Sequence, residues 1–232
     1  MNKCMAHRGW SSKAPENTMA AFQLAFQEPR IDSIEMDVQL SNDGVPIIIH
    51  DFTLDRTTNG TGFVYQYSYQ ELARLDAGGG QKIPTLEEVL QASRGKCKLN
   101  LEIKTAGGLH PGIERKVVDL IKQYQMEGEV VLTSFDHPVI EKVKYLSTTI
   151  RTGLIMSGMP TMLNDQLSRT GATILSMEYP FITKTFADEM LSRGIEIVAW
   201  TVNTPEEIEK VMKIHPEIQI CTNYPDRMFP FM

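Results

Sequence analysis

Residues 33–51, SIEMDVQLSNDGVPIIIHD, decide the fold, because they describe a strand, a turn and a returning strand. Apolar residues occupy every second position of the first half, which is typical of a strand with one apolar face. The positions between them carry Glu35 and Asp37, so both carboxylates lie on one face. The returning run of isoleucines ends on His50. The sequence therefore predicts a hairpin that brings a histidine back toward two carboxylates.

The Asp43-Gly44 pair between these two runs is a strong hairpin signal. A two-residue turn at this pair would set His50 opposite Asp37, and a turn one residue earlier would set it opposite Glu35. A three-residue loop would not bring the imidazole to the carboxylate face. We therefore expect one of the two-residue turns.

Short apolar runs alternate with amphipathic segments along the whole chain. The expected strands are 3–7, 33–40, 45–50, 98–104, 129–135, 150–156, 173–179, 196–202 and 218–223. The expected helices are 16–27, 85–93, 111–125, 137–146, 183–193 and 204–215, the last with Thr204 as N-cap and Pro205 at its first position. This alternation indicates a parallel sheet with helical crossovers. If 45–50 is a hairpin return, eight parallel strands remain, which predicts an α/β fold, a TIM-type (β/α)8 barrel with a β-hairpin at strand 2.

Length and charge limit the class of protein. The 232 residues can form a single catalytic barrel domain over 1–232. Residues 52–84 contain TTNGTG, YQYSY and DAGGG with little periodicity, so we expect a small insertion on the barrel rim. The net charge of −6 argues against a nucleic acid or an anionic membrane as the main partner. The longest apolar runs are strand-sized, so no membrane span is expected.

The cysteines indicate a reducing compartment. Cys4, Cys97 and Cys221 are few, odd in number and far apart, which favours buried free thiols. No Cys or His spacing suggests zinc. The first residues, MNKCMAHRGW, lack the apolar region of a secretory signal, so we expect a cytoplasmic location.

Charged residues fall where barrel enzymes carry their sites, at the C-terminal ends of the strands. His7 ends the first expected strand, and the alternation in LNLEIK points Glu102 and Lys104 into the barrel mouth. Together with Glu35 and Asp37, Glu102 would make three carboxylates that repel one another unless a cation lies among them. Oxygen ligands without cysteine suit Mg²⁺, Ca²⁺ or Mn²⁺. In the alternative, Lys104 pairs with Glu102, and water solvates the other two carboxylates.

The remaining charged groups indicate phosphoryl chemistry. His7 and His50 can act as general acid and base, because imidazole titrates near neutral pH. Arg8 and Lys104 are cations that suit a phosphoryl group whose charge must be held in the transition state. No GxGxxG or GxxxxGK[ST] motif indicates a dinucleotide or a nucleoside triphosphate. Three histidines at expected helix ends are given structural roles: His110, His137 and His215.

In their order and spacing, ten short motifs resemble the glycerophosphodiester phosphodiesterase family over nearly the whole chain. They are HRG (7–9), APENT (14–18), E-x-D (35–37), DGVPIIIHD (43–51), LDRTTNGTG (54–62), IPTLEEVL (83–90), LEIK (101–104), SFD (134–136), WTVN (200–203) and CTNYPD (221–226). The family is similar to phosphoinositide-specific phospholipases C in its barrel and paired histidines. Sphingomyelin-cleaving barrels are a weaker match. One departure is Leu109-His110, where an aromatic residue often precedes the PG pair, and it leaves the leaving-group pocket undefined.

The resemblance implies metal-dependent hydrolysis of glycerophosphodiesters to sn-glycerol 3-phosphate and an alcohol. It implies one divalent ion, Mg²⁺ or Ca²⁺, with Mn²⁺ as a further candidate. The implied roles are His7 and His50 as the acid/base pair, Glu35, Asp37 and Glu102 as metal ligands, Arg8 and Lys104 as phosphate contacts, and Phe135 and Trp200 as walls of the substrate pocket. Around them, Glu16 and Asn17 are expected to fix the first loop and cap its helix, and Arg56 to hold the segment after His50 with Asp51 as a partner.

Two alternatives stay open. A lysophospholipase D-type phosphodiesterase acting on acylated substrates would need a wide apolar rim, whereas segment 52–84 is rich in Tyr and Gly. A non-catalytic barrel that only binds phosphodiesters would have lost a histidine or a carboxylate, and none is lost. Five points are left undecided: which histidine is the acid, whether water or the glycerol 2-hydroxyl attacks, which alcohol leaves, which metal is used in the cell, and the oligomeric state.

Overall fold

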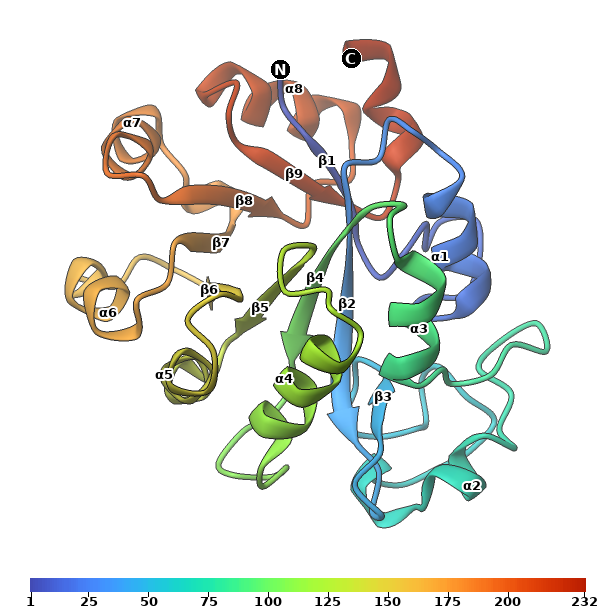
Figure 1. Cartoon of the computed structure of the whole chain (residues 1–232). Coiled ribbons are helices and arrows are strands. Elements are labelled where there is room, and N and C mark those ends of the chain that lie inside the picture. Colours follow the sequence, from blue (N-terminus) through green and yellow to red (C-terminus); the bar gives the residue numbers. More distant parts are fainter.

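The computed structural model describes residues 1–232 and has a closed barrel of strands with helices around its outside (Figure 1). The eight parallel strands follow one another around the wall, and the last pairs with the first. They are β1 (Cys4–Ala6), β2 (Ser33–Leu40), β4 (Lys98–Ile103), β5 (Val130–Ser134), β6 (Arg151–Met156), β7 (Ile174–Glu178), β8 (Glu196–Trp200) and β9 (Gln219–Thr222). The ninth strand, β3 (Pro46–Ile48), is antiparallel to β2. The predicted TIM-type barrel is therefore confirmed.

Helices cover the outer face of the barrel wall. They are α1 (Met19–Phe26), α3 (Leu86–Ser93), α4 (Ile113–Gln123), α5 (His137–Leu146), α6 (Leu163–Thr170), α7 (Lys184–Ser192) and α8 (Pro205–Ile214). The six predicted helices are all present, and α8 begins as predicted, with the Thr204 side chain accepting from the Glu207 amide. Helix α6 was not predicted, because its eight residues hold one spaced pair of large apolar side chains, Leu163 and Leu167, which is too few to give a periodic pattern.

The main apolar core lies between the barrel wall and these helices, with side chains such as Phe22, Leu101 and Ile121 fully buried. A smaller apolar cluster lies inside the barrel and consists of Met5, Ile174, Val198 and Cys221. It forms a floor below the charged side chains of the barrel mouth. Cys4 and Cys221 are buried free thiols and Cys97 is half-buried.

The hairpin of β2 and β3 extends the barrel wall at its C-terminal end. Strand β2 has eight residues and β1 only three, so β1 pairs with the start of β2 and leaves its later part free. Strand β3 occupies this free edge, with Leu40 opposite Pro46 and Val38 opposite Ile48. The edge that β2 would otherwise expose is therefore paired.

The predicted two-residue turn is wrong, because the hairpin has a three-residue loop, 42–44. The Gly44 amide donates to the Ser41 carbonyl over 2.9 Å, and Gly44 has a left-handed φ of +78°. This is a type I turn followed by a left-handed residue, the usual three-residue hairpin loop. Side chains select it: the Ser41 hydroxyl donates to Asp43 over 2.6 Å, and the Asp43 carboxylate also accepts from the Tyr69 amide.

In this register, a continued strand would set Met36 opposite His50. His50 still reaches the carboxylates, because β3 ends at Ile48 and the chain bends out of the ladder. The bend after β3, and not the strand itself, therefore places His50 beside the carboxylates.

The insertion, 52–84, lies beside β3 and holds the short helix α2 (Tyr69–Leu72), which was not predicted (Figure 1). It has its own apolar cluster with the outer face of the hairpin, made of Ile47, Ile49, Leu54, Val64, Leu72, Ala77 and Ile83. This packing fixes the insertion against the strand that leads to His50.

None of the helices has the length and apolar character that a membrane crossing requires.

Candidate active site

The predicted site residues meet at the C-terminal mouth of the barrel. His7 and Arg8 directly follow β1, and the β2–β4 pairing sets Asp37 beside Glu102, with Lys104 just beyond the end of β4. A hollow of about 330 Å³ lies at the other end of the strands and contains none of these residues. Because parallel-barrel chemistry belongs to the C-terminal ends, we assign the site to the mouth.

Three buried carboxylates form the centre of the site. Glu35, Asp37 and Glu102 are each less than a tenth exposed, and one oxygen from each lies within 4.8 Å of the others. Burial, with the charges of Asp37 and Glu102 adding to it, raises the pKa of Glu35 well above its usual range. Burial and Asp37 also raise the pKa of Glu102 to about 7. The negative charges of the three carboxylates therefore repel one another within the cluster.

This donor set fits a divalent cation. The Oδ1 atom of Asp37 is buried without a hydrogen-bond partner, as a carboxylate oxygen reserved for a metal would be. Hard carboxylate oxygens without sulfur ligands suit Mg²⁺ or Ca²⁺. The alternative of solvated carboxylates is wrong for Glu35 and Asp37, although Lys104 does pair with Glu102 over 2.8 Å.

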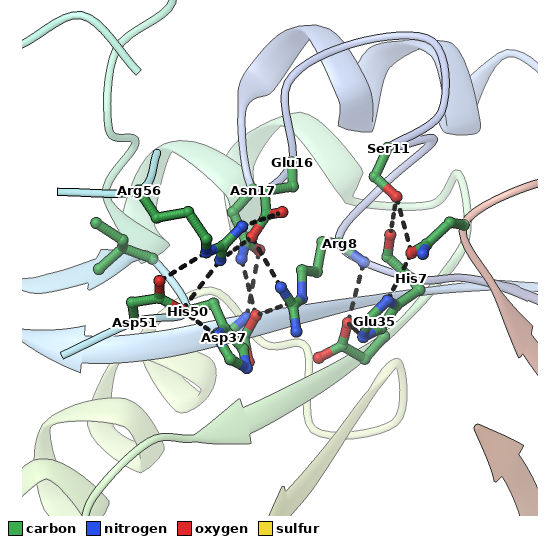
Figure 2. Close-up of polar contacts among 12 residues, drawn as sticks. His7, Arg8, Ser11, Glu16, Asn17, Glu35, Asp37, His50, Asp51 and Arg56 are labelled. Atoms are coloured by element: carbon green, nitrogen blue, oxygen red, sulfur yellow. Dashed lines mark hydrogen bonds and ion pairs between the residues drawn. The ribbon is translucent and has the colours of Figure 1, made fainter. Parts of the chain in front are cut away.

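Arg8 joins the first loop to the carboxylates. Its backbone amide donates to Glu35 over 3.0 Å, and its guanidinium donates to Glu16 over 2.8 Å and lies 3.5 Å from Asp37 (Figure 2). Asn17 donates to the same Asp37 carboxylate over 2.8 Å. The expected helix cap at Asn17 is wrong: its φ of +57° is unsuitable, and Thr18, which is extended, caps α1 instead.

The imidazole of His7 is fixed by a neutral amide. Its Nδ1 lies 2.7 Å from Oδ1 of Asn223, and since an amide oxygen only accepts, Nδ1 carries the proton. The lone pair of Nε2 is then directed into the mouth, 3.8 Å from Glu35. Burial and the charge of Arg8 lower the pKa of His7 to about 4, so the ring is neutral at neutral pH.

Asn223 and the residue behind it were not predicted as site residues. The backbone amide of Asn223 donates to Oδ1 of Asn203 over 3.0 Å. Both asparagines lie within motifs quoted above, Asn203 in WTVN and Asn223 in CTNYPD, just beyond the ends of β8 and β9. This position at the mouth was the available signal.

The imidazole of His50 is fixed by a carboxylate instead. Its Nδ1 donates to Asp51 over 2.6 Å, which leaves Nε2 facing the mouth, 3.3 Å from Nζ of Lys104. Burial lowers the pKa of His50; the charges of Lys104 and Arg8 add to this effect and that of Asp37 opposes it. The two histidines therefore have the same tautomer but partners of different charge.

Arg56 connects the two sides of the site. It donates to Asp51 over 2.6 Å and to Glu16 over 2.7 Å, and Glu16 in turn binds Arg8 (Figure 2). Although burial alone would raise it, Arg56 and Arg8 lower the pKa of Glu16 to about 2. The expected contact between Arg56 and Asp51 is present, and the insertion thereby supports both histidine-bearing segments.

The opposite wall of the mouth is apolar. Phe135, Ile155 and Trp200 line one pocket with His7 and two of the carboxylates, Glu35 and Glu102. The rings of Phe135 and Trp200 meet edge to face, with centroids 5.7 Å apart, and Phe135 remains 47% exposed. The pocket thus combines a charged wall with an apolar one.

The sequence profile of the Glycerophosphoryl diester phosphodiesterase family matches residues 7–227, which include both histidines and all three carboxylates. The chain belongs to this family. It is similar to the glycerophosphodiester phosphodiesterase of Caldanaerobacter subterraneus subsp. tengcongensis, with 39% identity over 218 residues, covering 90% of this chain and 89% of the relative. A putative glycerophosphodiester phosphodiesterase of Bacillus subtilis is 36% identical, covering 96% and 94% of the two chains.

Solved structures of family members have the same fold. A phosphodiesterase from Oleispira antarctica, in complex with the product sn-glycerol 3-phosphate, is 30% identical with a TM-score of 0.92, covering 99% of this chain and 96% of that one. A putative glycerophosphodiester phosphodiesterase from Galdieria sulphuraria has 27% identity and a TM-score of 0.90, with 100% and 97% covered. The predicted glycerophosphodiester phosphodiesterase, a phosphoric diester hydrolase, is confirmed.

Proposed function

We propose that this phosphodiesterase hydrolyses glycerophosphodiesters to sn-glycerol 3-phosphate and an alcohol by acid/base catalysis between His7 and His50 beside a divalent metal. The carrying observation is that both imidazoles direct Nε2 into the mouth that holds the three carboxylates. The Oleispira antarctica relative, which was solved with sn-glycerol 3-phosphate, supports the choice of product.

The metal would be held by Glu35, Asp37 and Glu102, with Mg²⁺ or Ca²⁺ preferred and Mn²⁺ acceptable to the same oxygens. When bound, such an ion supplies a Lewis acid that polarises a phosphoryl oxygen. Arg8 and Lys104 lie beside the cluster, at 3.5 and 3.9 Å from the Asp37 carboxylate, and would hold the other phosphoryl oxygens.

The unlike partners of the two histidines suggest their roles. The carboxylate of Asp51 stabilises a positive His50 ring, whereas the amide of Asn223 gives His7 no such charge. We therefore assign His7 as the base that takes the proton from the attacking hydroxyl. His50 is the acid that protonates the leaving alcohol oxygen as its bond to phosphorus breaks.

Either water or the neighbouring glycerol 2-hydroxyl can be the attacking group. Attack by the 2-hydroxyl gives a cyclic phosphate, which water then opens. Chromatography of early reaction samples distinguishes the two routes, because only the second accumulates a cyclic intermediate.

Phe135 and Trp200 would contact the carbon face of glycerol or the leaving alcohol, since they form the apolar wall of the pocket. The same half of the molecule supports a second candidate activity, a lysophospholipase D-type cleavage of acylated substrates. Three further apolar side chains are more than two-fifths exposed on the connections after β6 and β7, namely Met159, Met162 and Phe181. These three side chains would form the apolar rim that an acyl chain needs, whereas the large hydrophobic side chain exposed in 52–84 is Phe63.

The deciding experiment measures release of glycerol 3-phosphate from glycerophosphocholine and glycerophosphoethanolamine, with EDTA and with added Mg²⁺ or Ca²⁺. Release that EDTA abolishes and one metal restores is the expected result. Lysophosphatidylcholine, assayed in parallel for choline release, tests the second candidate. Cleavage of the acylated substrate alone would reverse the ranking, and no cleavage of either by a folded sample would leave only the binding barrel.

A further inference from the structure

The bend that carries His50 is held by a single buried side chain, Gln39. Its Nε2 atom lies 3.0, 3.1 and 2.7 Å from the carbonyl oxygens of Ile49, His50 and Asp51. Gln39 is 1% exposed, so water does not compete for these acceptors. The Ile49 amide still donates to the Asp37 carbonyl over 2.9 Å after β3 has ended at Ile48. The amide of Gln39 supplies a donor for the carbonyl oxygens of the segment, which would otherwise lack one from the β2 backbone.

The other end of the Gln39 amide is held by His110. A side-chain amide oxygen only accepts hydrogen bonds. Nε2 of His110 lies 3.3 Å from Oε1 of Gln39 and must therefore carry the proton. His110 is 4% exposed, and burial lowers its pKa to about 4, which leaves the ring neutral with one proton to donate. The three carbonyls already favour the nitrogen end of the amide, because they only accept, and the His110 donor holds the opposite end in the matching orientation.

We propose that Gln39 and His110 are positioning residues that aim the imidazole of His50 by fixing the bend at 49–51. The inference rests on the acid/base role proposed for His50. Neither residue belongs to the carboxylate cluster or lines the pocket of the apolar wall, and the contacts of Gln39 are with the 49–51 segment that carries His50. The sequence predicted only a structural role for His110, at a helix end. Its hydrogen bond to Gln39 gives a physical reason for a histidine at this departure from the family pattern.

Two variants of His110 separate the hydrogen bond from packing. His110→Phe keeps an aromatic ring against Phe52 but removes the donor, and His110→Gln keeps a donor without the ring. We expect His110→Phe to lower kcat about tenfold with KM changed less than about twofold, because small displacements of a catalytic group are costly. His110→Gln should recover most of kcat. His215→Phe, at the end of α8 and away from the mouth, is the matched control and should leave both constants unchanged.

Side-chain ¹⁵N–¹H NMR of the substrate-free protein gives an independent readout. His50 and His7 each have an Nδ1 proton in a short hydrogen bond, to Asp51 and Asn223. In His110→Phe the His50 signal should shift or broaden while the His7 signal stays in place, which also reports that the barrel is folded. An unchanged His50 signal with unchanged kcat, or equal shifts of both signals, would overturn the proposal.

The two proposals fail in different ways. A wild-type protein without any turnover would refute the phosphodiesterase mechanism, and the NMR comparison of His110→Phe with His110→Gln would still support or overturn the positioning role by itself.

Discussion

Strands β1, β2 and β4 present charged side chains to the barrel mouth, whereas β5, β6 and β8 present Phe135, Ile155 and Trp200. The charged half is tied together by hydrogen bonds and ion pairs that reach from Arg8 to Arg56. The apolar half is held by packing, and Phe135 is still half exposed. The groups proposed for bond cleavage and the groups proposed for substrate contact therefore come from different parts of the sheet. Substitutions in the two halves should therefore give different kinetic effects.

The largest effect is expected from the two histidines. His7→Ala and His50→Ala should each lower kcat at least about a hundredfold, because each removes a proton-transfer group. Steady-state release of glycerol 3-phosphate measures this loss, and Phe135→Ala, from the apolar half, should keep kcat within a few-fold. Full turnover in both histidine variants would contradict the proposal that the charged half carries the proton-transfer groups.

The carboxylates should control metal affinity, and this affinity should depend on pH. The pKa of Glu102 is about 7, so below pH 7 the carboxyl is increasingly protonated and must release a proton before it can bind an ion. Calorimetric titration with Mg²⁺ should give weaker binding at pH 6 than at pH 8, with proton release near pH 7. Asp37→Asn should weaken binding by about ten- to a hundredfold. Glu196→Gln, at the far end of the barrel, is the charge-matched control, and equal losses in both variants would contradict the assignment.

A smaller effect is expected from the apolar half. Trp200→Ala should raise KM for glycerophosphodiesters about three- to tenfold, since aromatic packing in such pockets contributes about 0.5–1.5 kcal/mol. The value of kcat should change little, and Phe181→Ala, outside the pocket, should leave KM unchanged. A fall in kcat without a rise in KM would show that Trp200 acts in bond cleavage, as the charged half is proposed to do, and not in substrate contact.

The last prediction concerns the free energy of unfolding and the buried ring of His110, which lies behind the charged half. Unfolded His110 has an ordinary pKa near 6.5 and takes up a proton at a higher pH than the folded residue, whose pKa is about 4. Falling pH between these values therefore favours the unfolded state. Between pH 7 and pH 4.5 the wild type should lose about 1–2 kcal/mol more free energy of unfolding than His110→Gln. Urea titrations at both pH values test this, and parallel losses would show that His110 is solvated.

The sequence alone was sufficient to predict the barrel and to predict which charged residues lie together at its mouth. In a parallel barrel every strand ends at the same mouth, so a residue's place at a strand end already decides its position. That rule brought together His7, Glu35, Asp37 and Glu102 from three strands. The order and spacing of the ten motifs then indicated the family with much less ambiguity than any single motif could.

The sequence was not sufficient for contacts that depend on loop geometry. The DG pair predicted the hairpin, yet hydrogen bonds from Ser41 and Asp43 decided the loop length and hence the register. The partner of His7, Asn223, lies 216 residues away, and no local pattern links the two. The contacts of the Gln39 amide with the bend arise only once β3 ends early.

Arg56 gives the insertion a consequence for protein engineering. A shortened chain that replaced 52–84 with a tight connection would keep the eight parallel strands, the seven helices around the barrel and the carboxylate cluster, and would lose α2. It would lose the one guanidinium that binds both Glu16 and Asp51. Such a minimal barrel should still bind a divalent ion while its two histidines drift apart in orientation. In this enzyme, the segment that looks most dispensable for folding sets a lower limit on the size of a working catalyst.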